Sequence, residues 1–213
     1  KGADISGKGE LSHLSSDKRT GDLLFLASNL DPAFFASFYP PVSDYRLKGE
    51  LSLTARVKGL LSRPTVHISL NSRNLSLMEN YRIRNLKAET DITDLKAGLP
   101  SDLRLDVSAD SAMLAGTSIQ TLKVELEKKG KVITVRQGSA ALGEGTLTAG
   151  GNVTLEDPTD KSALNLALKG QNIGLEKVVL ADGTKLPLAG VITGEVVATG
   201  SVKDPRISVN ATA

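Results

Sequence analysis

The chain is dominated by a regular alternation of apolar and polar residues. From Leu47 to Lys58 every odd position is apolar or glycine, and every even position is polar or charged. Successive side chains of a β-strand point to opposite faces of its sheet, so this period of two predicts strands with one apolar and one polar face. The pattern returns at intervals of about 8 to 15 residues and predicts about fourteen strands.

The predicted strands lie between segments of turn chemistry such as Lys128-Lys129-Gly130 and Gly143-Glu144-Gly145. They centre on Ile5–Leu11, Leu23–Ala27, Leu47–Val57, Val66–Leu70, Leu75–Leu77, Leu86–Ile92, Leu103–Ala109, Ala112–Ala115, Leu122–Leu126, Val132–Val135, Gly145–Leu155, Leu164–Leu168, Gly190–Ala198 and Ile207–Ala211.

Two short segments depart from the alternation and predict helices. Asp31–Pro40 has aspartate at the N-cap, proline at the first helical position and a terminating proline. Leu175–Ala181 falls at the corresponding place in the second half of the chain. The fold class expected is therefore all-β, an elongated, curved and open sheet with an apolar interior and one or two short helices.

The chain repeats itself with a long period. Gly49, Gly59 and Pro64 match Gly190, Gly200 and Pro205 at a spacing of 141 residues, and Asn29-Leu30 matches Asn172-Ile173 at 143. A period of about 142 residues is too long for one hairpin, so each copy is interpreted as a group of hairpins in an elongating sheet. We expect residues 1–213 to form a single continuous segment of a longer protein, with residues 5–71 matching residues 146–213.

The composition limits the classes of function. Only 3% of the residues are aromatic and there is no tryptophan, so the apolar content is almost entirely aliphatic. A net charge of +2 offers no footprint for nucleic acid, and the absence of cysteine excludes disulfides and cysteine-bound zinc. The densest basic cluster, at residues 128–131, is interpreted as a solvated hairpin turn rather than a contact for an anionic headgroup.

No arrangement of residues predicts catalysis. His13 lies beside a turn, and His67 alternates with Val66 and Ile68, so it is expected on the polar face of its strand. Nucleophile elbows, zinc-binding helices and phosphate-binding loops are absent from the sequence. We expect neither an enzyme, nor a cofactor, nor a metal site.

The ordered run from Asn29-Leu30-Asp31 through Leu47–Leu53, Val57-Lys58-Gly59, Pro64-Thr65-Val66 and Asn74–Leu77 resembles a repeating unit of the AsmA-like superfamily, most closely its TamB group. The continuation through Leu103–Val107, Gly116–Ile119 and Leu122–Leu126 also fits the short amphipathic strands of that family. The resemblance covers essentially the whole chain.

This resemblance implies a trough-shaped sheet, or β-taco, in the periplasm of a Gram-negative bacterium. It implies that phospholipid travels along a hydrophobic groove between the inner and outer membranes. The partner implied is an Omp85-family outer-membrane barrel, TamA, contacted through another part of the full protein. The inner-membrane anchor that the family carries would likewise lie outside this segment.

The residues expected to line a lipid-binding groove are the inward aliphatic positions of the predicted strands. They are Leu51, Leu53, Val57, Val66, Ile68, Leu70, Leu103, Leu105, Val107, Leu122, Val124, Leu126, Leu164, Leu166, Leu168, Ile192, Val196, Ile207 and Val209.

Three alternatives remain open at this stage. A closed sandwich would use the same alternation to bury its own core. A scaffold that assists the assembly or secretion of outer-membrane proteins and autotransporters would offer strand edges to its clients. A surface adhesin of tandem sandwiches would have a closed core and bind no lipid.

Overall fold

The structure, a computed structural model, describes residues 2–15, 18–32, 46–78, 81–93, 102–114, 116–156, 161–177, 179, 184–185 and 187–213. Its strands are β1 (Asp4–Ser12), β2 (Thr20–Leu30), β3 (Lys48–Gly49), β4 (Leu51–Leu60), β5 (Thr65–Leu77), β6 (Tyr81–Thr93), β7 (Asp102–Leu114), β8 (Thr117–Lys129), β9 (Val132–Leu142), β10 (Gly145–Thr154), β11 (Ala163–Gly174), β12 (Val191–Ser201) and β13 (Pro205–Thr212). A 3₁₀ turn, η3, covers Leu175–Lys177.

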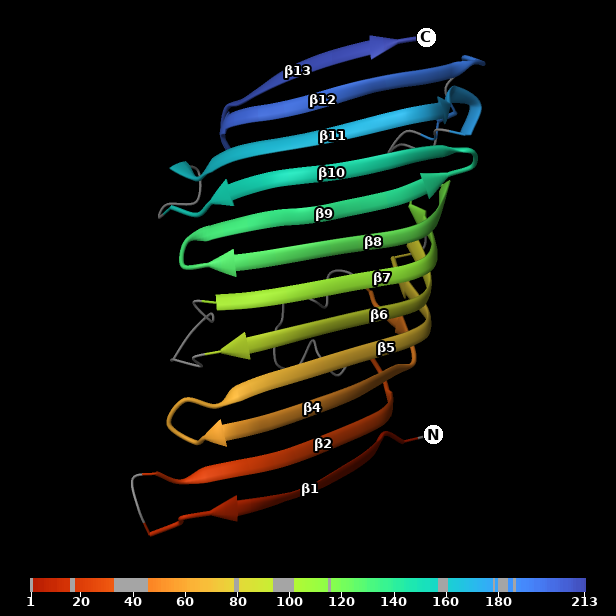
Figure 1. Cartoon of the computed structure of the whole chain (residues 1–213). Helices are drawn as coiled ribbons and strands as arrows, with labels where there is room; N and C mark the ends of the chain where they lie inside the picture. The colour runs from red at the N-terminus through yellow and green to blue at the C-terminus, as the bar shows by residue number, and fades with distance from the viewer. Residues whose placement is uncertain are drawn as a thin grey trace.

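All of these strands belong to one antiparallel sheet of 13 strands. Its order follows the chain, β1-β2-β4-β5-β6-β7-β8-β9-β10-β11-β12-β13, and β3 pairs with β5 beside this path. Figure 1 shows the strands stacked as a ladder from β1 to β13. The two outermost strands do not pair with each other, so the sheet is open and unclosed. The prediction of a curved, open, all-β sheet is confirmed.

Several strands are longer than the alternation predicted, because the alternation changes phase inside them. The segments Val66–Leu70 and Leu75–Leu77 form one strand, β5, and the segments around Leu103 and Ala112 form β7. At the change of phase two successive inward residues are three positions apart instead of two. In six strands these pairs are Ala27 and Leu30, Ser72 and Leu75, Ile83 and Leu86, Ala109 and Ala112, Ile119 and Leu122, and Gly170 and Ile173. β9 has a separate irregularity between Val135 and Gly138, where its register with β8 and β10 shifts.

In each of four of these six intervals, one residue has a left-handed backbone conformation. Asn29, Asn85, Thr121 and Asn172 have φ values between 50° and 55°. Such a residue adds one position to the strand and bends it, as β-bulges do, while the ladder continues on both sides. We call the line that joins the six changes of phase in β2, β5, β6, β7, β8 and β11 the fold line. In Figure 1 the ends of β5 to β8 turn back behind the sheet.

The buried core lies along the fold line, on the inward side of the sheet. One cluster contains Leu30, Leu51 and Leu75, and the other contains Ala112, Ile119, Leu142 and Ile173. The sheet therefore buries aliphatic side chains against its own bent part. Away from the fold line the inward side chains are less completely covered, since most of them are only half-buried.

The expected helices differ from what the structure contains. Of the expected helix Leu175–Ala181, the residues Leu175–Lys177 form a 3₁₀ turn, and Val179 pairs with Lys185 in an isolated β-bridge, so an α-helix does not continue through Val179. Val178, Leu180 and Ala181 lie outside the described residues. Beyond Asp31 and Pro32, the other expected helix lies outside the described residues. No α-helix occurs among the residues that the structure describes.

Two groups of four strands, β1-β2-β4-β5 and β10-β11-β12-β13, have matching registers. Gly9 pairs with Leu23 in the first group, and Gly151 pairs with Leu166 in the second. The register between the next two strands shifts between Ala27 and Leu30, and again between Gly170 and Ile173. These positions correspond at the sequence spacings of 142 and 143 residues.

Candidate functional site

Residues paired directly across antiparallel strands project from the same face of a sheet. The inward residues of neighbouring strands therefore form rows that run across the sheet. Three such rows extend from β1 to β13 between the fold line and the opposite margin, and together we call them the apolar face. The row nearest that margin is the rim row, and the second and third rows follow toward the fold line.

The rim row contains Gly9, Leu23, Val57, Val66, Ile92, Leu103, Lys128, Ile133, Val153, Leu164, Gly200 and Pro205. The second row contains Gly7, Phe25, Ala55, Ile68, Thr90, Leu105, Leu126, Val135, Gly151, Leu166, Ala198 and Ile207. The third row contains Ile5, Ala27, Leu53, Leu70, Ala88, Val107, Val124, Gly138, Ala149, Leu168, Val196 and Val209.

The third row is apolar without interruption. Each of its members pairs directly with the next, from Ile5 in β1 to Val209 in β13, and none carries a polar side chain. Neighbouring strands lie about 4.8 Å apart, so the row spans roughly 50 Å along the sheet. A hydrocarbon chain placed anywhere on this row meets only aliphatic carbon or glycine.

All nineteen residues expected to line a groove point to this face of the sheet. The rim row holds Val57, Val66, Leu103 and Leu164, the second row holds Ile68, Leu105, Leu126, Leu166 and Ile207, and the third row holds Leu53, Leu70, Val107, Val124, Leu168, Val196 and Val209. Leu51, Leu122 and Ile192 lie beside the fold line.

Their accessibility differs widely. Leu51 is only 4% exposed because it packs with Leu30 and Leu75 in the core, and Val66 is 7% exposed. The protein itself covers these two side chains, so they are not available to a ligand in this structure. At the other extreme Ile207 and Val209, in the edge strand β13, are each 66% exposed.

Sequence reasoning did not include several residues of the same rows. Leu23, Phe25, Ile133, Val135 and Val153 complete the rows on β2, β9 and β10. Their strands were predicted, and the alternation alone would have indicated their side of the sheet. Core residues such as Leu75, Ile83 and Ile119 were harder to find, since their phase is reversed beyond the fold line.

Two residues interrupt the apolar character of the rows. Thr90 lies in the second row between Ile68 and Leu105, and its Oγ1 is buried and makes no hydrogen bond. Lys128 lies in the rim row between Leu103 and Ile133, and it is the one charged residue in these three rows of the described chain.

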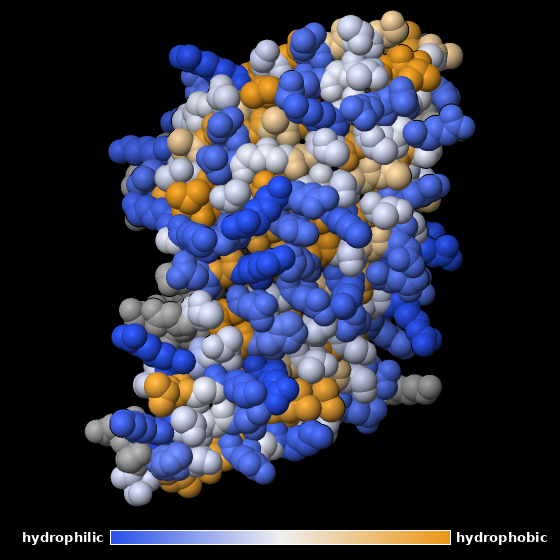
Figure 2. All heavy atoms as spheres, viewed as in Figure 1, coloured by the Kyte–Doolittle hydropathy of each residue, from blue (hydrophilic) through white to orange (hydrophobic). Residues whose placement is uncertain are grey.

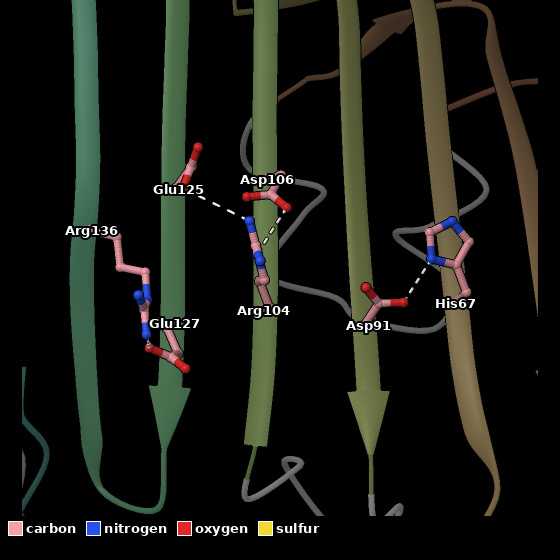
Figure 3. Close-up of polar contacts among 7 residues, drawn as sticks. All are labelled: His67, Asp91, Arg104, Asp106, Glu125, Glu127 and Arg136. Carbon is pink, nitrogen blue, oxygen red and sulfur yellow. Dashed lines mark hydrogen bonds and ion pairs between the residues drawn. The ribbon is translucent and has the colours of Figure 1, made fainter.

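The opposite, outer face carries the charged residues that alternate with the apolar ones. Figure 2 shows the same side as Figure 1, and hydrophilic side chains predominate there, with scattered hydrophobic ones. Ion pairs bridge adjacent strands, as shown in Figure 3. Arg104 Nη2 of β7 lies 3.9 Å from Glu125 Oε2 of β8, and Arg136 Nε of β9 donates to Glu127 Oε2 of β8 at 2.6 Å.

Ion pairs of the outer face lower the pKa of two carboxylates. The hydrogen bond from Arg56, at 2.7 Å to Asp22 Oδ2, lowers the pKa of Asp22. Hydrogen bonds from Lys129 and Arg136 lower the pKa of Glu127. All of these groups lie on an exposed surface, where water and salt screen the interactions, so they contribute little to folding stability.

The outer face also holds the histidine of β5. His67 Nδ1 lies 2.7 Å from Asp91 Oδ1, which places this histidine on the polar side of β5 as expected (Figure 3). Within the described ranges, no group of three or more histidine, aspartate or glutamate residues could hold a metal ion. Over the same ranges, no helix has the length and apolar character needed to span a membrane.

A hollow of about 950 Å³ lies near the fold line between β4, β5 and β6. Polar residues, including Asn71, Arg73 and Lys87, form much of its lining. Ligand-binding cavities for apolar molecules are lined mainly by hydrophobic side chains, and this hollow is not. The apolar face is an open surface instead of an enclosed cavity, and its continuity distinguishes it as the candidate site.

Comparison of the chain with protein-family models, with curated proteins and with solved structures finds no match in any of the three.

Proposed function

We propose that the chain is a non-catalytic segment of a lipid conduit, in which the acyl chains of phospholipids lie against the apolar face. The observation that carries this proposal is the third row, which crosses the twelve strands of the main path from β1 to β13 without a polar side chain. A binding pocket for one molecule would need only a few strands. A row that runs the length of the sheet suits a cargo that moves along it.

The free energy of hydration supports a continuous apolar surface. Exposing an acyl chain of sixteen carbons to water costs about 10 kcal/mol, at roughly 0.8 kcal/mol per methylene. A carrier that moves lipid through water must therefore shield the chain along the whole path. Aliphatic side chains without hydrogen-bonding groups do this equally at every step, so the lipid meets no deep trap.

Under this proposal the segment works in the periplasm of a Gram-negative bacterium, between the inner and outer membranes. An Omp85-family barrel in the outer membrane would receive the lipid through another part of the full protein. Both statements depend on the resemblance to the AsmA-like superfamily, and the composition agrees with them because the chain contains no cysteine to mispair in an oxidising compartment.

Fluorescence quenching would test the proposal directly. The chain has no tryptophan, so a single introduced tryptophan reports on its own surroundings. Leu168→Trp places the indole in the third row, where the native side chain is already 43% exposed. Phospholipid with brominated acyl chains should strongly quench this tryptophan, because bromine must lie close to the indole to act.

The matched control is Asn165→Trp, which lies on the same strand but points to the outer face. Its fluorescence should change little with the same lipid. Equal quenching at both positions would indicate nonspecific adsorption, and no quenching at Leu168→Trp would contradict the proposal. Leu105→Trp, in the second row of β7, provides an independent position if the first variant does not fold.

Transport, as distinct from binding, requires continuity of the row. Val124→Arg places a charge in the third row of β8, where an acyl chain would have to pass an ion in an apolar setting. We expect lipid transfer by the full-length protein to fall strongly. Lys123→Arg on the outer face of the same strand should transfer lipid normally. Normal transfer by a folded Val124→Arg variant would exclude this row as the path.

A scaffold for client proteins is the second candidate. Its supporting observation is that β1 and β13 each pair with one neighbour within the described residues, since an edge strand presents backbone groups to another strand. Photocrosslinks from β13 to unfolded outer-membrane proteins, without lipid quenching in the interior rows, would favour the scaffold over the conduit.

A further inference from the structure

The cations of the outer face differ in whether they have a partner. On the long part of the sheet, Arg104 and Arg136 form ion pairs with carboxylates of β7 and β8 (Figure 3). Lys48, Arg82 and Arg84 are exposed, and within the described residues the side chains of these three form neither an ion pair nor a hydrogen bond. They therefore mark a surface that differs from the rest of the outer face.

These three cations lie on the bent part of the sheet, which consists of β3 and the ends of β5, β6, β7 and β8 beyond the fold line. There Leu75, Ile83 and Ala112 pair with one another in turn and point into the core. Arg82 and Arg84 flank Ile83 in the chain, so both point to the outer face.

Two rows of paired residues bring the cations close together. Lys48 pairs with Ser76, which pairs in turn with Arg82, so two strand spacings, or about 10 Å, separate the two cations. Arg84 lies two residues from Arg82 on the same strand and pairs with Ser111. Between β3 and β8 neither row contains a carboxylate.

A hollow of about 560 Å³ lies between these side chains, and we call it the basic hollow. Lys48, Arg82 and Arg84 line it together with Ser111 and Ser118. Within the described structure neither of these two serine hydroxyls makes a hydrogen bond. The basic hollow therefore combines three cations with two hydroxyl groups that are available to a ligand.

The geometry of the bend does not itself require a cation at this place. Gly49 corresponds to Gly190 in the second four-strand group, and both have a positive φ, of 140° and 133°. A Cβ at Gly49 would lie 2.3 Å from the carbonyl oxygen of Asn74, so glycine allows β3 to lie against β5. The neighbour of this glycine is Lys48 in the first group and Ala189 in the second. The glycine is kept and the lysine is not.

Unpaired cations on adjacent strands repel one another and lower the stability of the sheet. Two carboxylates of nearby strands do not neutralise them. Glu50 forms no ion pair within the described residues, and Asp110 accepts a hydrogen bond of 2.7 Å from Asn85 instead. A bound anion would remove the repulsion, so the basic hollow has a positive charge that a ligand can satisfy.

We propose that the basic hollow binds a phosphate group, carried either by a soluble ester or by the headgroup of a lipid. A phosphate monoester has a charge of about −1.5 to −2 at neutral pH and three acceptor oxygens. Guanidinium groups donate to such oxygens in pairs, and lysine and serine can supply further donors. A carboxylate has one charge and two oxygens, so it satisfies fewer of these donors. The site lies on the face opposite the proposed lipid path and does not depend on it.

NMR titration of the chain with glycerol 3-phosphate, at constant ionic strength, measures both the affinity and the place of binding. We expect the largest amide shifts in β3 and in the bent part of β5, β6 and β7. Inorganic phosphate should shift the same amides, and glycerol should not. The double variant Arg82→Gln/Arg84→Gln should bind about tenfold more weakly, the scale of one charge-assisted hydrogen bond.

Two further variants separate this site from a general effect of charge. Lys123→Gln/Arg206→Gln removes the same charge from outer positions of β8 and β13, and it should bind glycerol 3-phosphate as the unchanged chain does. Arg82→Lys/Arg84→Lys keeps the charge but loses the paired donors, so it should retain only part of the affinity. The substituted arginines are exposed, so all three variants should fold.

Dihexanoyl phosphatidic acid, used below the concentration at which it forms micelles, distinguishes the two sources of phosphate. Tighter binding than glycerol 3-phosphate at the same amides would assign the site to a lipid headgroup. Equal binding would assign it to a soluble ester. Amides of the third row report any contact of the acyl chains with the apolar face separately.

Three outcomes would overturn the inference. Glycerol 3-phosphate could shift no amide of the basic hollow, Arg82→Gln/Arg84→Gln could bind it as well as the unchanged chain, or Lys123→Gln/Arg206→Gln could lose as much affinity. Each outcome would leave the conduit intact, because the tryptophan reporter at position 168 lies on the other face. Conversely, a failure of lipid to quench that reporter would not affect the phosphate site.

Discussion

The first four-strand group and the last differ most in the surroundings of their final strand. Val66 in β5 and Ile207 in β13 occupy corresponding positions, and each pairs with the corresponding residue of the preceding strand, Val57 or Ala198. Yet Val66 is 7% exposed and Ile207 is 66% exposed. The strand β6 pairs with the far side of β5, whereas β13 is an edge of the sheet. Equal local geometry therefore does not fix burial, which depends on the neighbouring strand.

The largest expected difference between the groups is in tolerance of a buried charge. We expect Val66→Asp to lower the free energy of unfolding by about 3 kcal/mol or more, because a carboxylate would lose its hydration without gaining a partner. Ile207→Asp should change it by less than about 0.5 kcal/mol, since the site is exposed to water. Urea denaturation of the two variants measures both values, and similar losses would show that β13 is covered in solution.

The bends of the two groups should respond alike. Asn29 and Asn172 correspond in sequence, and their φ values are 55° and 54°. A β-branched residue is strained in this region, so Asn29→Val and Asn172→Val should each cost about 1 to 2 kcal/mol. Glycine at either position should cost much less. The midpoints of denaturant unfolding would measure these costs. If valine left the stability unchanged at one of the two positions only, the two groups would not be equivalent.

A smaller effect on stability is expected for Thr90, the polar residue of the second row, whose strand lies between the two groups. Thr90 Oγ1 is buried and makes no hydrogen bond within the described structure. Thr90→Val replaces this hydroxyl with a methyl group of similar volume, and we expect it to raise the free energy of unfolding by about 1 kcal/mol. Calorimetry would detect the change. A loss of stability would mean that the hydroxyl has a hydrogen-bond partner in solution.

The smallest effect is a difference in acid sensitivity. The first group has the Asp22–Arg56 ion pair, and the corresponding residues of the second group are Asn165 and Val197. Arg56 lowers the pKa of Asp22 from its ordinary 3.8, so the ion pair stabilises the folded state above that pH and is lost as the pH falls through the lowered pKa. The contribution is small because both side chains are exposed.

Hydrogen exchange measures this difference in acid sensitivity separately for each strand. Between neutral pH and a pH well below 3.8, protection of β2 and β4 should fall slightly more than that of β11 and β12, after correction for intrinsic exchange. Asp22→Asn should remove the difference. If it persists in that variant, another titrating group is responsible.

The alternation along the chain was sufficient to predict an all-β chain and the face of each predicted groove residue. It could not separate an open sheet from a closed sandwich, because both use the same alternation. Leu53, Leu105 and Val124 point inward because the residues on either side of them are polar. Successive side chains of a strand alternate between the two faces of the sheet, so a strand that buries one face must turn these apolar residues toward it. The same reasoning could not predict that Val66–Leu70 and Leu75–Leu77 belong to one strand. A single added residue reverses the alternation, and only the backbone shows that the ladder continues through it.

The candidate site was predicted only in part for the same reason. Leu51 and Leu103 are equivalent in an alternating sequence, but Leu51 lies at the fold line and is covered by Leu30 and Leu75. Lys128 resembled a turn residue because the sequence around it is basic, and its membership of the apolar face follows from its pairing with Leu103. In both cases, contacts between residues that are distant in the sequence determine whether the side chain belongs to the open apolar face.

The sequence by itself determined that strands form and which side chains share a face, because these properties depend on residues one and two positions apart. The tertiary structure decided which strands become edges, where the sheet bends and which aliphatic residues remain open to a ligand. Those properties depend on the order in which strands assemble and on backbone angles at a few positions, and neither is expressed in a local pattern of polarity.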